Sequence, residues 1–113
     1  MIHKDNINKI PENWQSLIDQ SELAEEIQQV NSELTAFAGL QLDIENPNPD
    51  EVIKVCAHTW NTSPTEVKNS WQAIIRLRVI TRLFKRHYGH LFPEDENGEI
   101  ILGPEALERI YRG

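Results

Sequence analysis

The chain has 113 residues, of which 39% are hydrophobic, and a formal net charge of −7. This length is typical of one domain, so we expect residues 1–113 to form a single domain. The one cysteine, Cys56, excludes an intramolecular disulfide and fits a reducing compartment. The N-terminus lacks the apolar run of a signal peptide, and no apolar stretch approaches the roughly 20 residues that span a bilayer. We therefore expect a cytoplasmic protein that does not enter a membrane.

The charge is distributed unevenly along the chain. Residues 1–51 carry 2 basic and 11 acidic side chains. Residues 52–92 carry 7 basic and 1 acidic, and residues 93–113 carry 2 basic and 6 acidic. An acidic protein is repelled from nucleic acid on average, but a local basic surface binds phosphate when the acidic parts face away. The alternative is that the acidic helices cover the basic one within the fold.

Acidic helices are expected over residues 1–45. A short helix is predicted to begin at Pro11 and to bury Trp14, Leu17 and Ile18. A second follows Ser21 and stops at Gly39. Apolar residues recur in the second at alternating steps of four and three, which is typical of a heptad-like seam. The seam comprises Leu23, Ile27, Val30, Leu34 and Phe37. It suits intramolecular packing or dimerisation.

A helix–turn–helix with a long basic second helix is expected over residues 48–91. Asn48 is predicted to cap the first helix, with Pro49 at its first position. Ser63 is predicted to cap the second, and Glu66 closes a capping box. Without Gly or Pro between Pro64 and Gly89, the second helix extends for close to 40 Å at about 1.5 Å per residue.

The apolar face of this long helix rotates by roughly 130° along its length. Val67 and Trp71 lie on the first face, and Phe84 and Tyr88 on the second. Either the helix kinks near residues 75–77, or its two halves bury different faces. Both alternatives fit the sequence.

An acidic turn and a last helix are expected over residues 92–113. Asn97-Gly98 is typical of a tight hairpin, residues 100–102 form a short predicted strand, and residues 105–112 form the helix. The predicted fold is therefore all-α, or mostly α with a short C-terminal β-hairpin. It has about five helices around a helix–turn–helix, with one long helix from Pro64.

The segment from Val52 to Gln72 resembles a generic helix-turn-helix motif, without pointing to a specific family. Small Ala57 is followed four positions later by Asn61 at the turn, then by apolar Val67 and Trp71. A turn position often takes a positive φ, which Gly adopts at least cost and Asn tolerates. Asn61 departs from the motif, where Gly is common. Trp60 and Trp71 are both predicted to lie in the core.

The resemblance favours a small DNA-binding regulatory protein acting in transcription regulation, because the second helix of this motif often enters the major groove. Base edges would be read by the exposed side of that helix, and phosphates would be contacted by flanking residues. The predicted readers are Thr65, Lys68, Asn69 and Gln72, and the predicted phosphate contacts are Ser63 and Arg76. The ordinary alternative is a solvated helix face, with Ser63 acting only as a cap.

The second hypothesis is a non-enzymatic adaptor or regulator that binds a protein. An acidic protein surface would dock on Arg78, Arg82, Lys85 and Arg86, or a partner helix on the seam from Leu23 to Phe37. A homodimer stays open, since paired subunits commonly read paired half-sites. We expect no metal or other cofactor, because His87 and His90 have no further ligands at a familiar spacing. We also expect no catalytic site, because the sequence has no phosphate-binding Gly loop and Cys56 is predicted to be an inert buried thiol.

Overall fold

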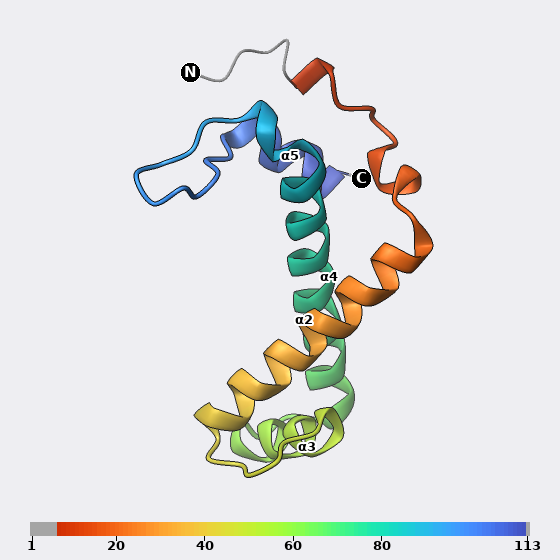
Figure 1. The fold of residues 1–113 in the computed structure, drawn as a ribbon. Coiled ribbons are helices and arrows are strands. Elements are labelled where there is room, and N and C mark those ends of the chain that lie inside the picture. Colours follow the sequence, from red (N-terminus) through yellow and green to blue (C-terminus); the bar gives the residue numbers. More distant parts are fainter. Residues whose placement is uncertain (1–6, 113) are drawn as a thin grey trace. The chain divides into compact units, whose positions relative to one another are not determined.

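The computed structural model describes residues 7–112 and is built from helices (Figure 1). The α-helices are α2 (Gln20–Gln41), α3 (Pro49–Thr59), α4 (Pro64–Tyr88) and α5 (Pro104–Arg112). Two short 3-10 helices, η1 (Trp14–Leu17) and η2 (Gly89–Leu91), accompany them. The all-α prediction is confirmed. Across residues 7–112 no helix combines the length and apolar character needed to cross a membrane.

The prediction of about five helices was wrong, because the segment after Pro11 forms only the 3-10 helix η1 before α2 begins at Gln20. The predicted burial of Leu17 was also wrong, since this residue at the end of η1 is 62% exposed.

The prediction of a C-terminal hairpin was wrong as well. Residues 93–103 form only an isolated antiparallel bridge between Glu94 and Ile100. The Asp95 carboxylate accepts the N–H groups of Asn97 (2.8 Å) and Glu99 (2.9 Å), so a side chain satisfies amides of this turn. Pro93 has no N–H to extend the pairing.

The chain divides into two compact units that share two helices. Unit 1 comprises residues 1–22 and 80–113, and unit 2 comprises residues 23–79. The boundaries fall inside α2, after Glu22, and inside α4, after Val79. The expected division into residues 1–45, 48–91 and 92–113 stays a prediction, as does the single domain.

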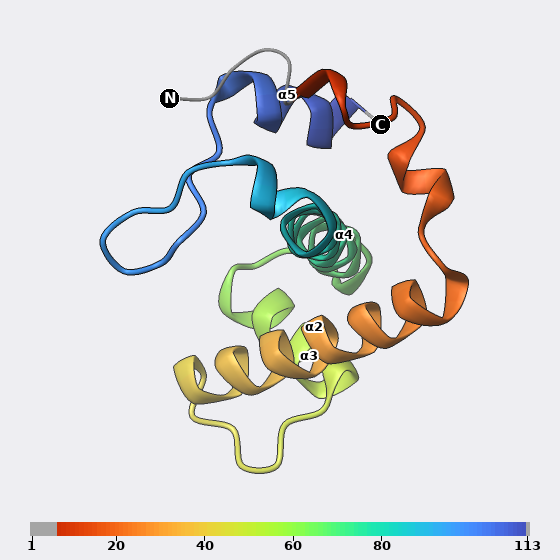
Figure 2. The ribbon, with the colours of Figure 1, turned by 45° about the horizontal axis from the view of Figure 1, so that its top comes forward.

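In unit 1, an aromatic core holds the N-terminal segment to the C-terminal helix. Trp14 is fully buried and meets Phe84 edge-on, with ring centroids 5.3 Å apart. The Trp14 indole N–H donates to the Arg109 carbonyl (3.3 Å), and the Gln15 amide donates to the Ile110 carbonyl (3.1 Å). Figure 2 shows the described part of this segment, drawn in red, lying beside α5. These long-range bonds order a segment that has little helix of its own.

In unit 2, α2 ends at a corner made by backbone geometry. Asp43 adopts a left-handed φ of 56°, and the Ile44 N–H donates to the Gly39 carbonyl (2.8 Å), as in a Schellman motif. The expected stop at Gly39 was wrong, since α2 continues to Gln41. Gly39 instead gives room to Pro47, because a Cβ at Gly39 would lie 2.7 Å from the Pro47 Cβ.

Helix α4 is continuous, and its two halves bury different faces. Val67 and Trp71 belong to the core of unit 2, whereas Phe84 belongs to the core of unit 1. Leu77, between the two clusters, is 49% exposed. Of the two alternatives for this helix, the rotation of the buried face is therefore the correct one, and no break accompanies it.

Candidate nucleic-acid interface

The turn between α3 and α4 is built around Asn61. This residue has a φ of 52°, which confirms the positive φ expected at the turn. The Thr62 N–H donates to the Ala57 carbonyl (2.9 Å), and the Asn61 N–H donates to the His58 carbonyl (3.3 Å). These bonds form a second Schellman motif, in which Asn replaces the usual glycine. They end α3 and direct the chain into α4.

Ser63 caps the start of α4 as the sequence predicts, but the predicted capping box was wrong, because the Glu66 carboxylate bonds to Thr62 and not to the Ser63 N–H. The Ser63 Oγ accepts the Glu66 N–H (3.2 Å), which satisfies one of the free amides of the first turn. The Glu66 carboxylate accepts a hydrogen bond from the Thr62 hydroxyl. An acidic side chain in the first turn also favours the positive end of the helix dipole. The first turn of α4 is therefore fixed by its own side chains.

The two helices pack through the residues that carry the motif resemblance. Ala57, Val67 and Trp71 are buried in the same cluster. The Trp71 indole N–H donates to the Asn31 side-chain oxygen (2.9 Å), so the core position predicted for Trp71 is confirmed. Trp60 is 67% exposed, and its predicted core position was wrong. Helical spacing from Cys56 would bury it, but α3 ends at Thr59 and the turn at Asn61 redirects the chain.

The predicted DNA-reading residues lie on one exposed face of α4. Positions 65, 68, 69, 72 and 76 fall within an arc of about 100° at the usual helical rotation. All five side chains are exposed, and so is Ser63 at the cap. These residues are Thr65, Lys68, Asn69, Gln72 and Arg76. We call them the α4 stripe.

A hollow of about 320 Å³ opens between α3 and the start of α4. Two members of the α4 stripe, Thr65 and Lys68, line it together with Asp50, Ile53, Lys54 and Pro64. Lys54 was missed by the sequence reasoning. Its position in the sequence could have indicated it. Lys54 directly follows Ile53, a residue of the face that packs against α4, and Asp50 lies one turn earlier.

The four basic residues predicted as a docking face do not share one environment. Arg78 lies in unit 2, whereas Arg82, Lys85 and Arg86 lie in unit 1. The Arg86 guanidinium pairs with Glu22 (3.2 Å), and the His87 Nε2 lies 2.8 Å from the other Glu22 oxygen. Hydrogen bonds from His87 and Arg86 lower the pKa of the Glu22 carboxyl. Arg86 thus already has an acidic partner within its own unit.

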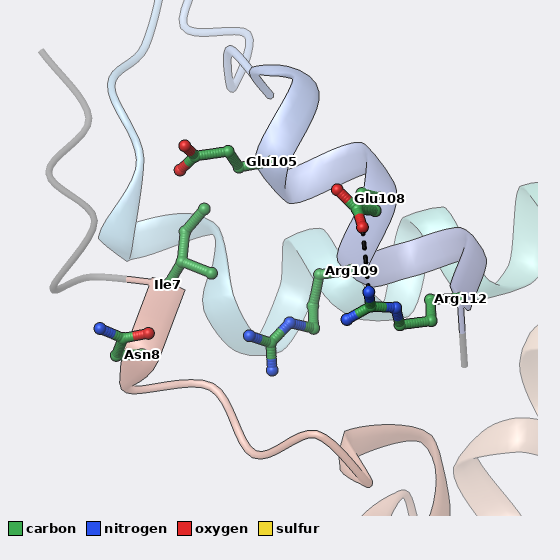
Figure 3. Close-up of a pocket in the computed structure, with 6 residues that line it drawn as sticks. All are labelled: Ile7, Asn8, Glu105, Glu108, Arg109 and Arg112. Carbon is green, nitrogen blue, oxygen red and sulfur yellow. Dashed lines mark ion pairs between the residues drawn. The ribbon is translucent and has the colours of Figure 1, made fainter.

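A second hollow, of about 220 Å³, lies in unit 1 and is drawn in Figure 3. Its cations already have partners: Arg112 pairs with Glu108 (3.2 Å), and Arg109 donates to the Ile10 carbonyl (3.2 Å). Glu105 and Glu108 balance the two arginines. This hollow therefore has less unpaired positive charge available to bind an anion than the hollow beside Lys54 and Lys68.

Residues 7–112 give little support for a metal site or a reactive cysteine. That part of the chain brings no three His, Cys, Asp or Glu side chains together around a common point. Cys56 is buried, and burial raises the pKa of its thiol, which lowers its thiolate fraction. The α4 stripe and its adjoining hollow are thus the strongest candidate site. No protein-family model, curated protein or solved structure matches this chain.

Proposed function

We propose that the protein is a small DNA-binding regulatory protein that reads DNA through the start of α4. The observation that carries this proposal is the α4 stripe, which follows the α3–α4 turn and stands exposed along one helix face. A helix presented in this way fits the width of the major groove. The buried Val67 and Trp71 hold the opposite side of the helix in the core of unit 2.

The side chains of the stripe supply the hydrogen-bonding groups that base recognition uses. Asn69 and Gln72 pair with the N6 and N7 positions of adenine, and Arg76 contacts phosphate. Ser63 accepts a backbone N–H through its Oγ, so its hydroxyl proton stays available for a phosphate oxygen. Residues 23–79 carry 8 acidic and 4 basic side chains. Binding therefore depends on the local arrangement of charge, and we expect it to weaken steeply with salt.

Selection from a random duplex library, followed by fluorescence anisotropy on the enriched sequence, tests this proposal. We expect Asn69→Ala and Gln72→Ala each to cost about 1–3 kcal/mol against the enriched site and little against random duplex. Ser70→Ala is the matched control, because Ser70 is exposed on α4 but lies outside the stripe. Absence of binding by the wild-type protein at low salt would contradict the proposal.

A protein partner is the second candidate, and the exposed end of the Leu23 to Phe37 seam favours it. Phe37 is 59% exposed and Leu40, one turn later on α2, is 82% exposed. Val30 and Leu34 of the same seam are buried, so the seam is only partly used by the fold. Sedimentation velocity over a range of concentrations tests self-association through this end. A dimer that Phe37→Ser together with Leu40→Ser abolishes would support it, and a monomer at every concentration would exclude a homodimer.

A further inference from the structure

The hollow between α3 and α4 combines a cavity with two cations from different helices. Lys54 enters from α3 and Lys68 from α4, and both line the space of about 320 Å³. Both lysines are exposed, and among residues 7–112 neither makes an ion pair. Asp50 is the one acidic residue lining the hollow. Two lysines against one carboxylate leave a net positive charge directly beside the α4 stripe.

We propose that this hollow seats one phosphate of the DNA backbone between Lys54 and Lys68. The inference rests on the proposed function and assigns Lys68 a different role from base reading. An ammonium group is a compact point charge that neutralises phosphate without the geometric selectivity of a bidentate contact. With its phosphate held here, the duplex is placed in register, and Asn69 and Gln72 read the bases.

The position of the hollow beside the α4 stripe favours a polynucleotide over a free phosphate ion. The hollow of about 320 Å³ opens to solvent beside Thr65 and Lys68, so a free phosphate ion would contact only the residues that line it. A backbone phosphate reaches the two lysines while its neighbouring nucleotides lie along the α4 stripe. Asp50 opposes any anion in the hollow, because like charges repel over a few ångströms. The Asp50 and Lys54 positions therefore predict effects of opposite sign.

The test measures anisotropy of a labelled random-sequence duplex over a range of salt concentrations, which needs no knowledge of the target site. Lys54→Gln and Lys68→Gln combined are expected to reduce the slope of log affinity against log salt by about 0.9, the value of the one phosphate that they share, and each alone by part of that amount. Both variants should weaken enriched and random duplexes by the same factor. Asp50→Asn should tighten binding to both. Lys9→Gln, an exposed lysine of unit 1, is the control for loss of one charge and should leave the slope unchanged.

Each outcome decides a different point. If the wild-type protein binds but the variant that combines Lys54→Gln and Lys68→Gln keeps its salt slope, the phosphate seat is overturned and the proposed function stands. If the wild-type protein fails to bind duplex at low salt, both are overturned. Inorganic phosphate is the competitor that separates the two sources of phosphate. Competition beyond that of chloride at equal ionic strength would assign the hollow to a free anion, against the proposal. Circular dichroism melts check that each variant is folded.

Discussion

Trp71 donates its indole N–H to the side-chain oxygen of Asn31, a bond of 2.9 Å between residues 40 positions apart. It joins α2 to α4 inside unit 2, beside the cluster that holds the α3–α4 turn. The bond gives Trp71 a polar partner that its apolar surroundings lack, and it links the N-terminal acidic helix to the candidate interface.

Removing the acceptor should leave the indole N–H unpaired in a partly buried site. We expect Asn31→Ala to lower the free energy of unfolding by about 1–3 kcal/mol, the cost of an unsatisfied buried polar group. Urea unfolding followed by circular dichroism measures this loss. Asn69→Ala removes the same group from an exposed position and should change stability by less than about 0.5 kcal/mol. Equal effects of the two variants would show that the bond contributes nothing to stability.

A methyl group at Gly39 should push Pro47 away from α2. The added Cβ would lie 2.7 Å from the Pro47 Cβ, so Gly39→Ala is expected to destabilise unit 2 by about 1–3 kcal/mol despite the better helix propensity of Ala. Thermal unfolding measures the change. Combining it with Pro47→Ala, which removes most of the opposing ring, should restore part of the loss. A stabilised Gly39→Ala variant would contradict the close approach.

Because the backbone at Asn61 is left-handed, the stability of the protein should depend strongly on which residue replaces Asn61. Asn61→Gly is expected to be neutral or slightly stabilising, whereas Asn61→Val should cost about 1–2 kcal/mol, because a β-branched side chain is strained at a φ of 52°. Asn13 has a φ of −93° and provides the control pair, since Val there carries no such penalty. Similar losses for Val at both positions would argue against the turn geometry.

Stability at acid pH should depend on Glu22. Its pKa is lowered in the folded protein by hydrogen bonds from His87 and Arg86, below its ordinary value of 4.5. The unfolded chain then binds the proton more readily, so this contribution is present above the ordinary pKa and is lost as the pH falls through the lower, folded-state pKa.

Glu22→Gln should therefore make the free energy of unfolding depend less steeply on pH in the acid range. Urea midpoints measured from about pH 3 to about pH 7 should fall less steeply in this variant than in the wild-type protein. Glu25→Gln makes the same charge change at an exposed position of α2 and should keep the wild-type acid limb. An acid limb in Glu22→Gln that matches the wild type would show that the pair with Arg86 and His87 does not stabilise the fold.

Local sequence signals predicted the parts of this fold that depend on local physics. The cap at Ser63, the positive φ at Asn61 and the all-α class follow from side chains within a few positions of each other. Trp60 was assigned to the wrong environment because helical spacing continues past the residue where α3 ends. Lys54 was missed because the hollow it lines exists only once two helices are packed together. Pairings such as Trp71 with Asn31 depend on tertiary packing, which spacing along one helix does not encode.

The different environments of the three tryptophans give the protein its own set of optical reporters. Trp14 is buried in the core of unit 1, Trp71 in the core of unit 2, and Trp60 is open to solvent at the turn. A buried indole emits at shorter wavelength than a solvated one, so variants that retain a single tryptophan would report on one place each. Denaturation curves from the Trp14 and Trp71 variants would show whether the two units lose structure in one transition or in two. The emission of Trp60 would respond to whatever comes to lie against the α3–α4 turn, without an attached dye.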